Sequence, residues 1–115
     1  MAAKSKTTAK KIAVLIENLY EDLEGWYPVL RLKEAGCEVV IIGPEVAEYK
    51  GKHGVPMKAD ASIKSVKASD FDGVIVPGGY APDKMRTNAA MVKLVADIFK
   101  RGGLVASICH GPWVL

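Results

Sequence analysis

Four short, mostly apolar runs stand out along the chain, and each is followed by a polar or glycine-containing turn. An alternating pattern would indicate a half-exposed strand, whereas a continuous apolar run is typical of a strand that is covered on both faces. We therefore expect four buried strands, at residues 12–16, 38–42, 74–76 and 104–108.

Two helices are predicted between these strands. The first covers residues 23–35 and ends at Gly36, because glycine is favoured just past a helix C-terminus. The second begins after Asn88, a favoured N-cap residue, and stops at Gly102. Its apolar residues recur at helical spacing and form one face, which consists of Met91, Leu94, Val95 and Ile98.

Buried strands that alternate with helices predict an α/β domain with a mostly parallel sheet. Residues 48–57 add two polar extended pieces around a glycine-containing turn, which indicates a small β-hairpin. In a parallel sheet, ligands bind at the carboxyl ends of the strands. Three segments are therefore candidates for a site: residues 17–24, 77–83 and 109–111.

A length of 115 residues and an apolar content of 50% are those of one globular domain. Residues 1–10 read as a disordered basic tail and residues 11–115 as the domain. The two cysteines exclude a disulfide-stapled scaffold and a Cys-rich zinc site. Metal-ligand spacing and cofactor-binding fingerprints are absent from the sequence, so no metal and no cofactor are expected.

No apolar run approaches the roughly 18 residues that span a bilayer, and the basic N-terminus lacks the apolar core of a signal peptide. We therefore expect a cytoplasmic protein with no membrane partner. The net charge is +3, but four lysines lie in the first eleven residues and no basic stripe follows them. Binding to nucleic acid is therefore not expected.

Residues 111–115 look like the first turn of a helix, and they end on apolar side chains. Such side chains need a covering layer, so we expect the chain to be the front part of a longer protein that is truncated here. The alternative is a short domain that covers these side chains by forming oligomers.

The sequence Ser107-Ile108-Cys109-His110-Gly111 has the form small-x-nucleophile-x-Gly between a predicted strand and a predicted helix start. This is the nucleophile-elbow pattern with Cys in place of Ser. Such a turn needs small flanking residues, exposes the sulfur in strained backbone geometry, and directs free N–H groups at it, which favours the thiolate. The alternative is that Cys109 is a small core residue, as most free cysteines are.

Residues near the other strand ends are candidates to serve this cysteine. Glu24 follows the first strand, and a protonated carboxyl there could donate a hydrogen bond to a thiolate. His110 is a candidate general base, and its backbone N–H is a candidate oxyanion donor. The glycines of Pro77-Gly78-Gly79 let a backbone amide approach a ligand closely and could supply a second such N–H, and Asp83 lies on the loop that follows. The alternatives are ordinary roles in helix termini and turns.

Four sequence motifs occur in order along the chain: Tyr-Glu-Asp-Leu-Glu at 20–24 with Tyr27-Pro28 after it, Gly-Lys-His-Gly at 51–54, Val-Pro-Gly-Gly-Tyr-Ala-Pro-Asp at 76–83, and Ala-Ser-Ile-Cys-His-Gly-Pro at 106–112. Together they resemble the PfpI family of intracellular cysteine hydrolases. The superfamily of these enzymes also contains the parkinsonism-associated protein deglycase and the class I glutamine amidotransferases. The match runs from about Lys11 to Leu115.

The resemblance implies a flavodoxin-like α/β sandwich of three layers, whose family fold continues beyond residue 115. By analogy, Cys109 is the nucleophile, Glu24 is the carboxyl that hydrogen-bonds its sulfur, and His110 is the catalytic histidine. Gly79 and His110 match the oxyanion amides. Asp83 sits where some members have a glutamate, one methylene longer, that reaches the histidine of a neighbouring subunit. Members form dimers or hexamers, so a homo-oligomer is expected.

The resemblance also implies a hydrolase linked to the stress response, with peptides or glycated and aldehyde small molecules as substrates. Peptidase, deglycase and glyoxalase activities share one chemistry, in which a thiolate attacks an electrophilic carbon. One alternative is a non-enzymatic redox sensor or holdase chaperone that uses the same reactive thiol. Another is an amidotransferase-like domain, which a histidine directly after the nucleophile disfavours.

Overall fold

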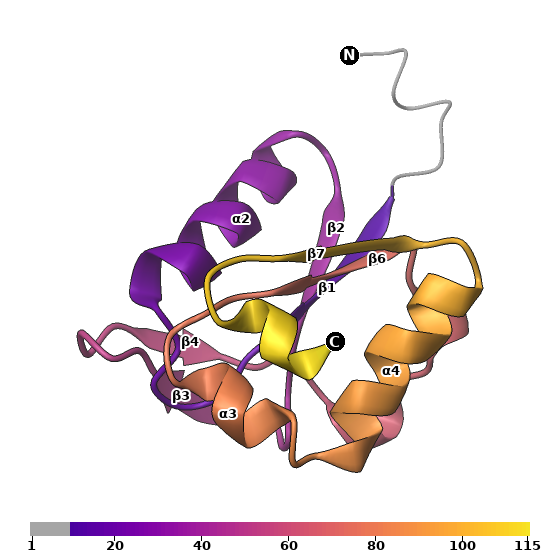
Figure 1. Ribbon diagram of the computed structural model, residues 1–115. Helices are drawn as coiled ribbons and strands as arrows, with labels where there is room; N and C mark the ends of the chain where they lie inside the picture. Colours follow the sequence, from indigo (N-terminus) through magenta and orange to yellow (C-terminus); the bar gives the residue numbers. More distant parts are fainter. Residues whose placement is uncertain (1–9) are drawn as a thin grey trace.

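A sheet of five parallel strands runs through the middle of the computed structural model, which describes residues 10–115 (Figure 1). The strand order is β5-β2-β1-β6-β7. The strands are β1 (Lys11–Leu15), β2 (Glu38–Gly43), β5 (Ala61–Ser62), β6 (Gly73–Val76) and β7 (Leu104–Ser107). The predicted parallel sheet is therefore confirmed, while the predicted disordered tail lies outside the described residues except for Lys10.

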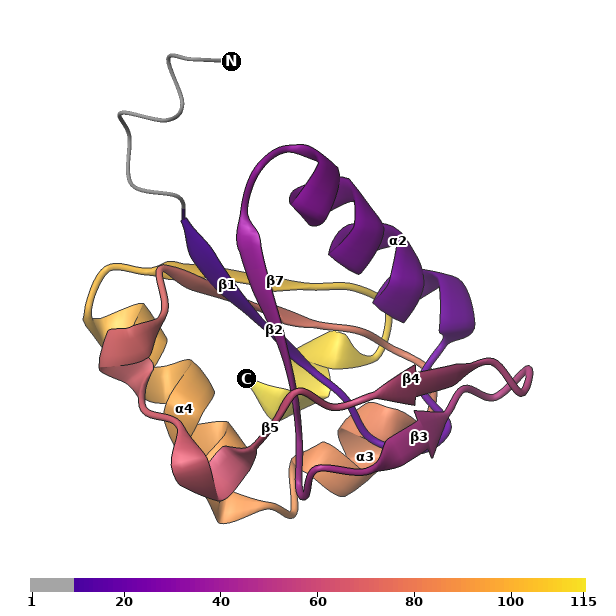
Figure 2. The ribbon, with the colours of Figure 1, turned by 180° about the vertical axis from the view of Figure 1, so that it is seen from behind.

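Helices cover both faces of this sheet. Helix α2 (Asp22–Glu34) lies on one face and helix α4 (Ala89–Lys100) lies on the other, as Figures 1 and 2 show. The short helix α3 (Ala81–Met85) packs against a final 3₁₀ turn, η3 (Gly111–Val114). This is the predicted flavodoxin-like arrangement of three layers. Within residues 10–115, no helix has both the length and the apolar character needed to cross a membrane.

The central strand β1 shows why continuous apolar runs mark buried strands here. Its residues from Ile12 to Leu15 are at most 5% exposed, because strands flank both edges and helices cover both faces. Val14 is aligned with Ile41 of β2 and with Ile75 of β6. Full burial of such a side chain contributes about 1.5–3 kcal/mol, so side chains on both faces of β1 stabilise the core.

Helix α4 begins and packs as its sequence predicts. The Asn88 side chain accepts hydrogen bonds from the N–H groups of Ala90 and Met91, and this satisfies two of the free donors at the helix start. The predicted apolar face, Met91, Leu94, Val95 and Ile98, is buried. The first helix is also confirmed, with Gly36 in the left-handed region just beyond its end.

The prediction of a fully buried fourth strand is wrong for β7. Leu104 is 58% exposed, and Ile108 lies beyond the end of the strand and is 49% exposed. Strand β7 is the last in the sheet, with β6 on one edge and no strand from residues 10–115 on the other. The apolar run therefore identified the strand correctly, but it did not show that the strand lies at an edge.

Four short elements within residues 10–115 were not among the predicted strands and helices, and two of them are the 3₁₀ helices η1 (Ile63–Ser65) and η2 (Ala68–Asp70). Strand β5 extends the sheet beyond β2 and has only two residues, which is too short to show a period. Helix α3 has five residues and places Pro82 at its start, where the missing N–H of proline costs nothing. Asp83, expected on a loop, lies in this helix.

The predicted hairpin is present as strands β3 (Glu48–Lys50) and β4 (Pro56–Lys58). The buried side chain of Asp22, at the start of α2, fastens the hairpin turn to the domain. Its two carboxylate oxygens accept hydrogen bonds from the backbone N–H groups of His53 and Val55, each at 2.8 Å. Burial raises the pKa of this carboxyl, but the N–H groups of His53, Val55 and Asp22, together with the charge of His53, outweigh burial and hold the pKa below its ordinary value.

The substitution Asp22→Asn is expected to loosen the hairpin. Because the Asp22 pKa is lowered on folding, its stabilisation is complete at neutral pH and is lost as the pH falls through that lowered pKa. An amide oxygen is a weaker acceptor, so the free energy of unfolding should fall by about 1–3 kcal/mol at neutral pH and lose this acid dependence. Amide hydrogen-exchange protection of His53 and Val55 measures the effect locally.

Asp60→Asn is the matched control, because the Asp60 carboxylate, between β4 and β5, accepts a hydrogen bond from the N–H of Ile41 in β2. The control should leave protection at His53 and Val55 unchanged. Protection in Asp22→Asn that still falls with acid as in the unmodified chain would contradict this role for Asp22.

Candidate active site

The chain turns sharply at Cys109, directly after strand β7. Cys109 has φ +58°, a left-handed conformation that residues other than glycine rarely adopt, and its side chain is exposed. The turn is closed by a 2.8 Å hydrogen bond in which the Gly111 N–H donates to the carbonyl oxygen of Ile108. Holding a cysteine in this conformation costs about 1–3 kcal/mol, so its surroundings must impose it. The predicted elbow is therefore formed, and the alternative of a buried Cys109 is excluded.

Glycine is required at position 111, at the end of the elbow, because the backbone of strand β6 lies very close to it. A Cβ atom at Gly111 would overlap the carbonyl oxygen of Val76 and would lie 3.0 Å from the Cβ of Ser107. The neighbouring strand β6 thus leaves no room for a side chain at this position. This contact is the structural reason for glycine two residues after the cysteine.

Gly78 lies between Glu24 and Cys109. Its N–H donates to Oε1 of Glu24 at 2.9 Å, and a Cβ atom at Gly78 would lie closer than 3.0 Å to both that oxygen and the Cβ of Cys109. The half-buried Glu24 carboxyl, from the first turn of α2, is therefore a near neighbour of the elbow. Within residues 10–115, Glu24 accepts the Gly78 N–H, and no hydrogen bond joins its carboxyl to the Cys109 sulfur.

Two backbone N–H groups beside the elbow remain free. The segment after β6 is tied to the segment after β1, because Glu21 N–H donates to Gly78 O and Tyr80 N–H donates to Leu19 O. These bonds leave the N–H of Gly79 between them without an acceptor among residues 10–115, and the N–H of His110 is likewise unpaired within that range. They are the two groups expected from the sequence as oxyanion donors.

Within residues 10–115, no hydrogen bond or ion pair joins the side chains of His110 and Asp83. The imidazole of His110 stacks on the indole of Trp113, with ring centroids 4.3 Å apart and planes inclined by 8°. The guanidinium of Arg86 lies over the same indole, 5.2 Å from its centroid. Asp83 pairs with Arg86 at 2.7 Å within the chain. Sequence reasoning missed Trp113 and Arg86, because nothing in their spacing indicates that they meet.

A second polar cluster, Glu21, Asp22 and His53, brings ligand-type atoms within 4.8 Å of one another. Its carboxylates already have donors from the chain, since Asp22 accepts two backbone N–H groups and Glu21 pairs with Lys52 at 3.3 Å. The cluster therefore fastens the hairpin to α2. No local motif could have identified it, because His53 lies about thirty residues from the carboxylates.

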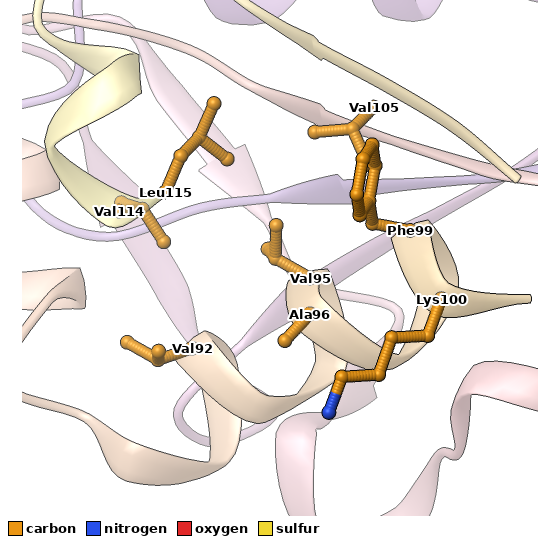
Figure 3. Close-up of a pocket in the computed structure, with 8 residues that line it drawn as sticks. All are labelled: Val92, Val95, Ala96, Phe99, Lys100, Val105, Val114 and Leu115. Atoms are coloured by element: carbon orange, nitrogen blue, oxygen red, sulfur yellow. The ribbon is translucent and has the colours of Figure 1, made fainter. Parts of the chain in front are cut away.

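A cavity of about 440 Å³ lies away from Cys109, between α4, β7 and the end of the chain (Figure 3). Its lining is almost wholly apolar and consists of Val92, Val95, Ala96, Phe99, Lys100, Val105, Val114 and Leu115. None of the candidate catalytic residues lines it. The candidate site is therefore the exposed elbow rather than this cavity.

Known sequences that are similar to this chain are longer than it is. The DJ-1/PfpI family profile matches residues 10–115. The chain is 43% identical over 105 residues to a deglycase of Pyrococcus horikoshii, and 43% identical over 108 residues to a candidate cysteine protease of Bacillus subtilis. These matches cover 91% and 93% of the chain but 63% and 64% of the relatives, so the chain spans less than two thirds of their length.

Solved structures share the fold. A two-domain protein of Anabaena variabilis with DJ-1/ThiJ/PfpI-like and ferritin-like domains has a TM-score of 0.89 at 48% identity, covering 91% of this chain and 31% of that one. Oxidised DJ-1 of Toxoplasma gondii has a TM-score of 0.86 at 30% identity, covering 93% and 59%. With the profile match over nearly the whole chain, these similarities show that the chain belongs to the DJ-1/PfpI family.

Proposed function

We propose that the chain carries the nucleophile of a cysteine-dependent hydrolase of the PfpI type. The observation that carries the proposal is the exposed Cys109 in a left-handed turn, with the Glu24 carboxyl beside it. The relatives named deglycase and candidate cysteine protease support it. Because several relatives at about 40% identity carry the name deglycase, removal of aldehyde adducts from amines is the preferred activity and peptide hydrolysis the second.

Both activities break a bond between carbon and a departing nitrogen. In an aldehyde adduct, the carbon that carries the nitrogen bears a hydroxyl group, and the Cys109 thiolate displaces the amine from this carbon. In a peptide, the thiolate attacks the carbonyl carbon, and the carbonyl electrons move onto oxygen. The free N–H groups of Gly79 and His110 then stabilise the oxyanion.

As the carbonyl re-forms, the C–N bond breaks, the His110 imidazole donates a proton to the departing amine, and a thioester remains on Cys109. His110 then accepts a proton from the attacking water, and the C–S bond breaks to release the carboxylic acid and the thiolate. The hemithioacetal formed from an aldehyde adduct instead loses its hydroxyl proton to His110, and its C–S bond breaks to release the aldehyde and the thiolate.

The role proposed for Glu24 is to stabilise the thiolate. Oε1 of its carboxyl accepts the Gly78 N–H, which leaves Oε2 free to carry a proton. From this position a protonated Oε2 would donate a hydrogen bond to the sulfur of Cys109 once the thiol has ionised. The carboxyl acts on the nucleophile and does not itself transfer a proton to substrate.

The homo-oligomer and the link to stress belong to the same proposal. In an oligomer, Asp83 would assist the histidine of a neighbouring subunit. It can do so only by exchanging its present partner, since its carboxylate is paired with Arg86 at 2.7 Å. Both side chains of that pair are more than half exposed, so the exchange requires no opening of the core.

Redox sensing is a second candidate function for the same cysteine. Cys109 is exposed, and an exposed thiolate is readily oxidised to the sulfenic or sulfinic acid. The Toxoplasma gondii neighbour is described in an oxidised form. A sensor would bind a partner only after oxidation and would show no turnover.

The substitution Cys109→Ser is expected to reduce turnover of methylglyoxal-derived adducts, or of peptides, by about 10³-fold or more. Cys37→Ser is the matched control, because Cys37 is the other cysteine and is half-buried at the far end of α2. Its turnover should equal that of the unmodified chain. Full activity in Cys109→Ser would exclude the proposed nucleophile, whereas oxidation-dependent binding without any turnover would favour the sensor.

The substitution Glu24→Ala is expected to slow alkylation of Cys109 at neutral pH by about tenfold, because the thiolate loses a hydrogen bond. Glu24→Gln should fall between this variant and the unmodified chain, since its amide can still donate to sulfur. Glu34→Ala, in an exposed ion pair with Arg31 on the same helix, is the control. Equal alkylation rates in Glu24→Ala and Glu34→Ala would exclude the role proposed for Glu24.

A further inference from the structure

The His110 imidazole stacks on an aromatic side chain, the indole of Trp113, which has no role in the proposed mechanism. Trp113 lies three residues after His110, within η3, and the two rings stack face to face at 4.3 Å. Nearly parallel planes, inclined by 8°, place the face of the imidazole against the indole. The ring nitrogens lie in the plane of the imidazole, so this contact leaves both of them free to exchange protons.

The charged side chain of Arg86 contacts the indole of Trp113 from another element. Arg86, just after α3, places its guanidinium over the Trp113 indole at 5.2 Å, which is a cation–π contact. Asp83, one turn earlier, fixes that guanidinium through an ion pair at 2.7 Å. Because α3 packs against η3, the contacts run from Asp83 through Arg86 and Trp113 to His110 across two separate elements.

We propose that Trp113 is a positioning residue for His110, and that Arg86 keeps Trp113 in place. The inference rests on the proposed function, in which His110 moves protons. The His110 side chain makes no hydrogen bond within residues 10–115 that would fix its orientation, so the stack is the contact that does so. An imidazole without it can rotate away from the departing amine, and misplacement of a proton donor slows the chemical step.

The test compares Trp113→Leu, which keeps an apolar side chain but loses the aromatic face, with Trp113→Phe, which keeps an aromatic face. Phe99→Leu is the matched control, because Phe99 is an exposed aromatic residue on α4. Turnover gives kcat and KM, the alkylation rate of Cys109 reports on the nucleophile alone, and the chemical shifts of the His110 ring protons report on stacking.

We expect Trp113→Leu to lower kcat by about 2- to 10-fold with KM and Cys109 alkylation unchanged. Its His110 ring protons should move downfield as the ring current of the indole is lost. Trp113→Phe should recover most of kcat, and Phe99→Leu should match the unmodified chain. Arg86→Gln should lower kcat less than Trp113→Leu does.

An unchanged kcat in Trp113→Leu, or an equal loss in Trp113→Phe and Trp113→Leu, would overturn the positioning role. So would His110 shifts that are the same with and without the indole. Turnover by Cys109→Ser at the rate of the unmodified chain would instead overturn the proposed function. In that case the His110 shifts still decide whether Trp113 holds the imidazole.

Discussion

Three segments meet at the carboxyl ends of strands β1, β6 and β7. They approach one another so closely that only glycine fits at the points of contact. A side chain at position 78 would collide with both Glu24 and Cys109, and one at position 111 would collide with the backbone of β6. The left-handed conformation of Cys109 persists because these contacts fix the chain on either side of it. The exposed sulfur, the neighbouring carboxyl and the two free N–H groups all depend on this packing.

The parallel sheet supplies that packing from distant parts of the sequence. Strands β1, β6 and β7 are adjacent, so the segments that leave their carboxyl ends emerge side by side. The first leads into α2, whose first turn carries Glu24. The second contains Gly78 and Gly79, and the third is the elbow itself. The hydrogen bond from Gly78 N–H to Glu24 spans 54 positions along the chain, which shows how the sheet assembles the site.

Much of the fold and of the elbow could be predicted from the sequence, because local residue patterns determine these features. The apolar run of β1, the Asn88 cap of α4 and the small residues around Cys109 each indicate a structure within a few residues of themselves. The contacts that were not predicted join segments far apart in the chain, and no local residue pattern indicates that such segments meet. Trp113 and Arg86 come from different elements, and the anchoring of the hairpin by Asp22 depends on two backbone N–H groups thirty residues away. The exposure of Leu104 was missed for a related reason, since an apolar run does not reveal which strand lies at an edge.

The most direct test of the account is whether folding itself makes Cys109 reactive. The alkylation rate of each cysteine, followed by mass spectrometry at neutral pH, is compared between the folded chain and the chain unfolded in denaturant. The account predicts that Cys109 reacts faster in the folded chain than in the unfolded one, while the half-buried Cys37 reacts more slowly when folded. A Cys109 that reacts no faster in the folded chain than in denaturant would contradict the claim that the elbow activates it.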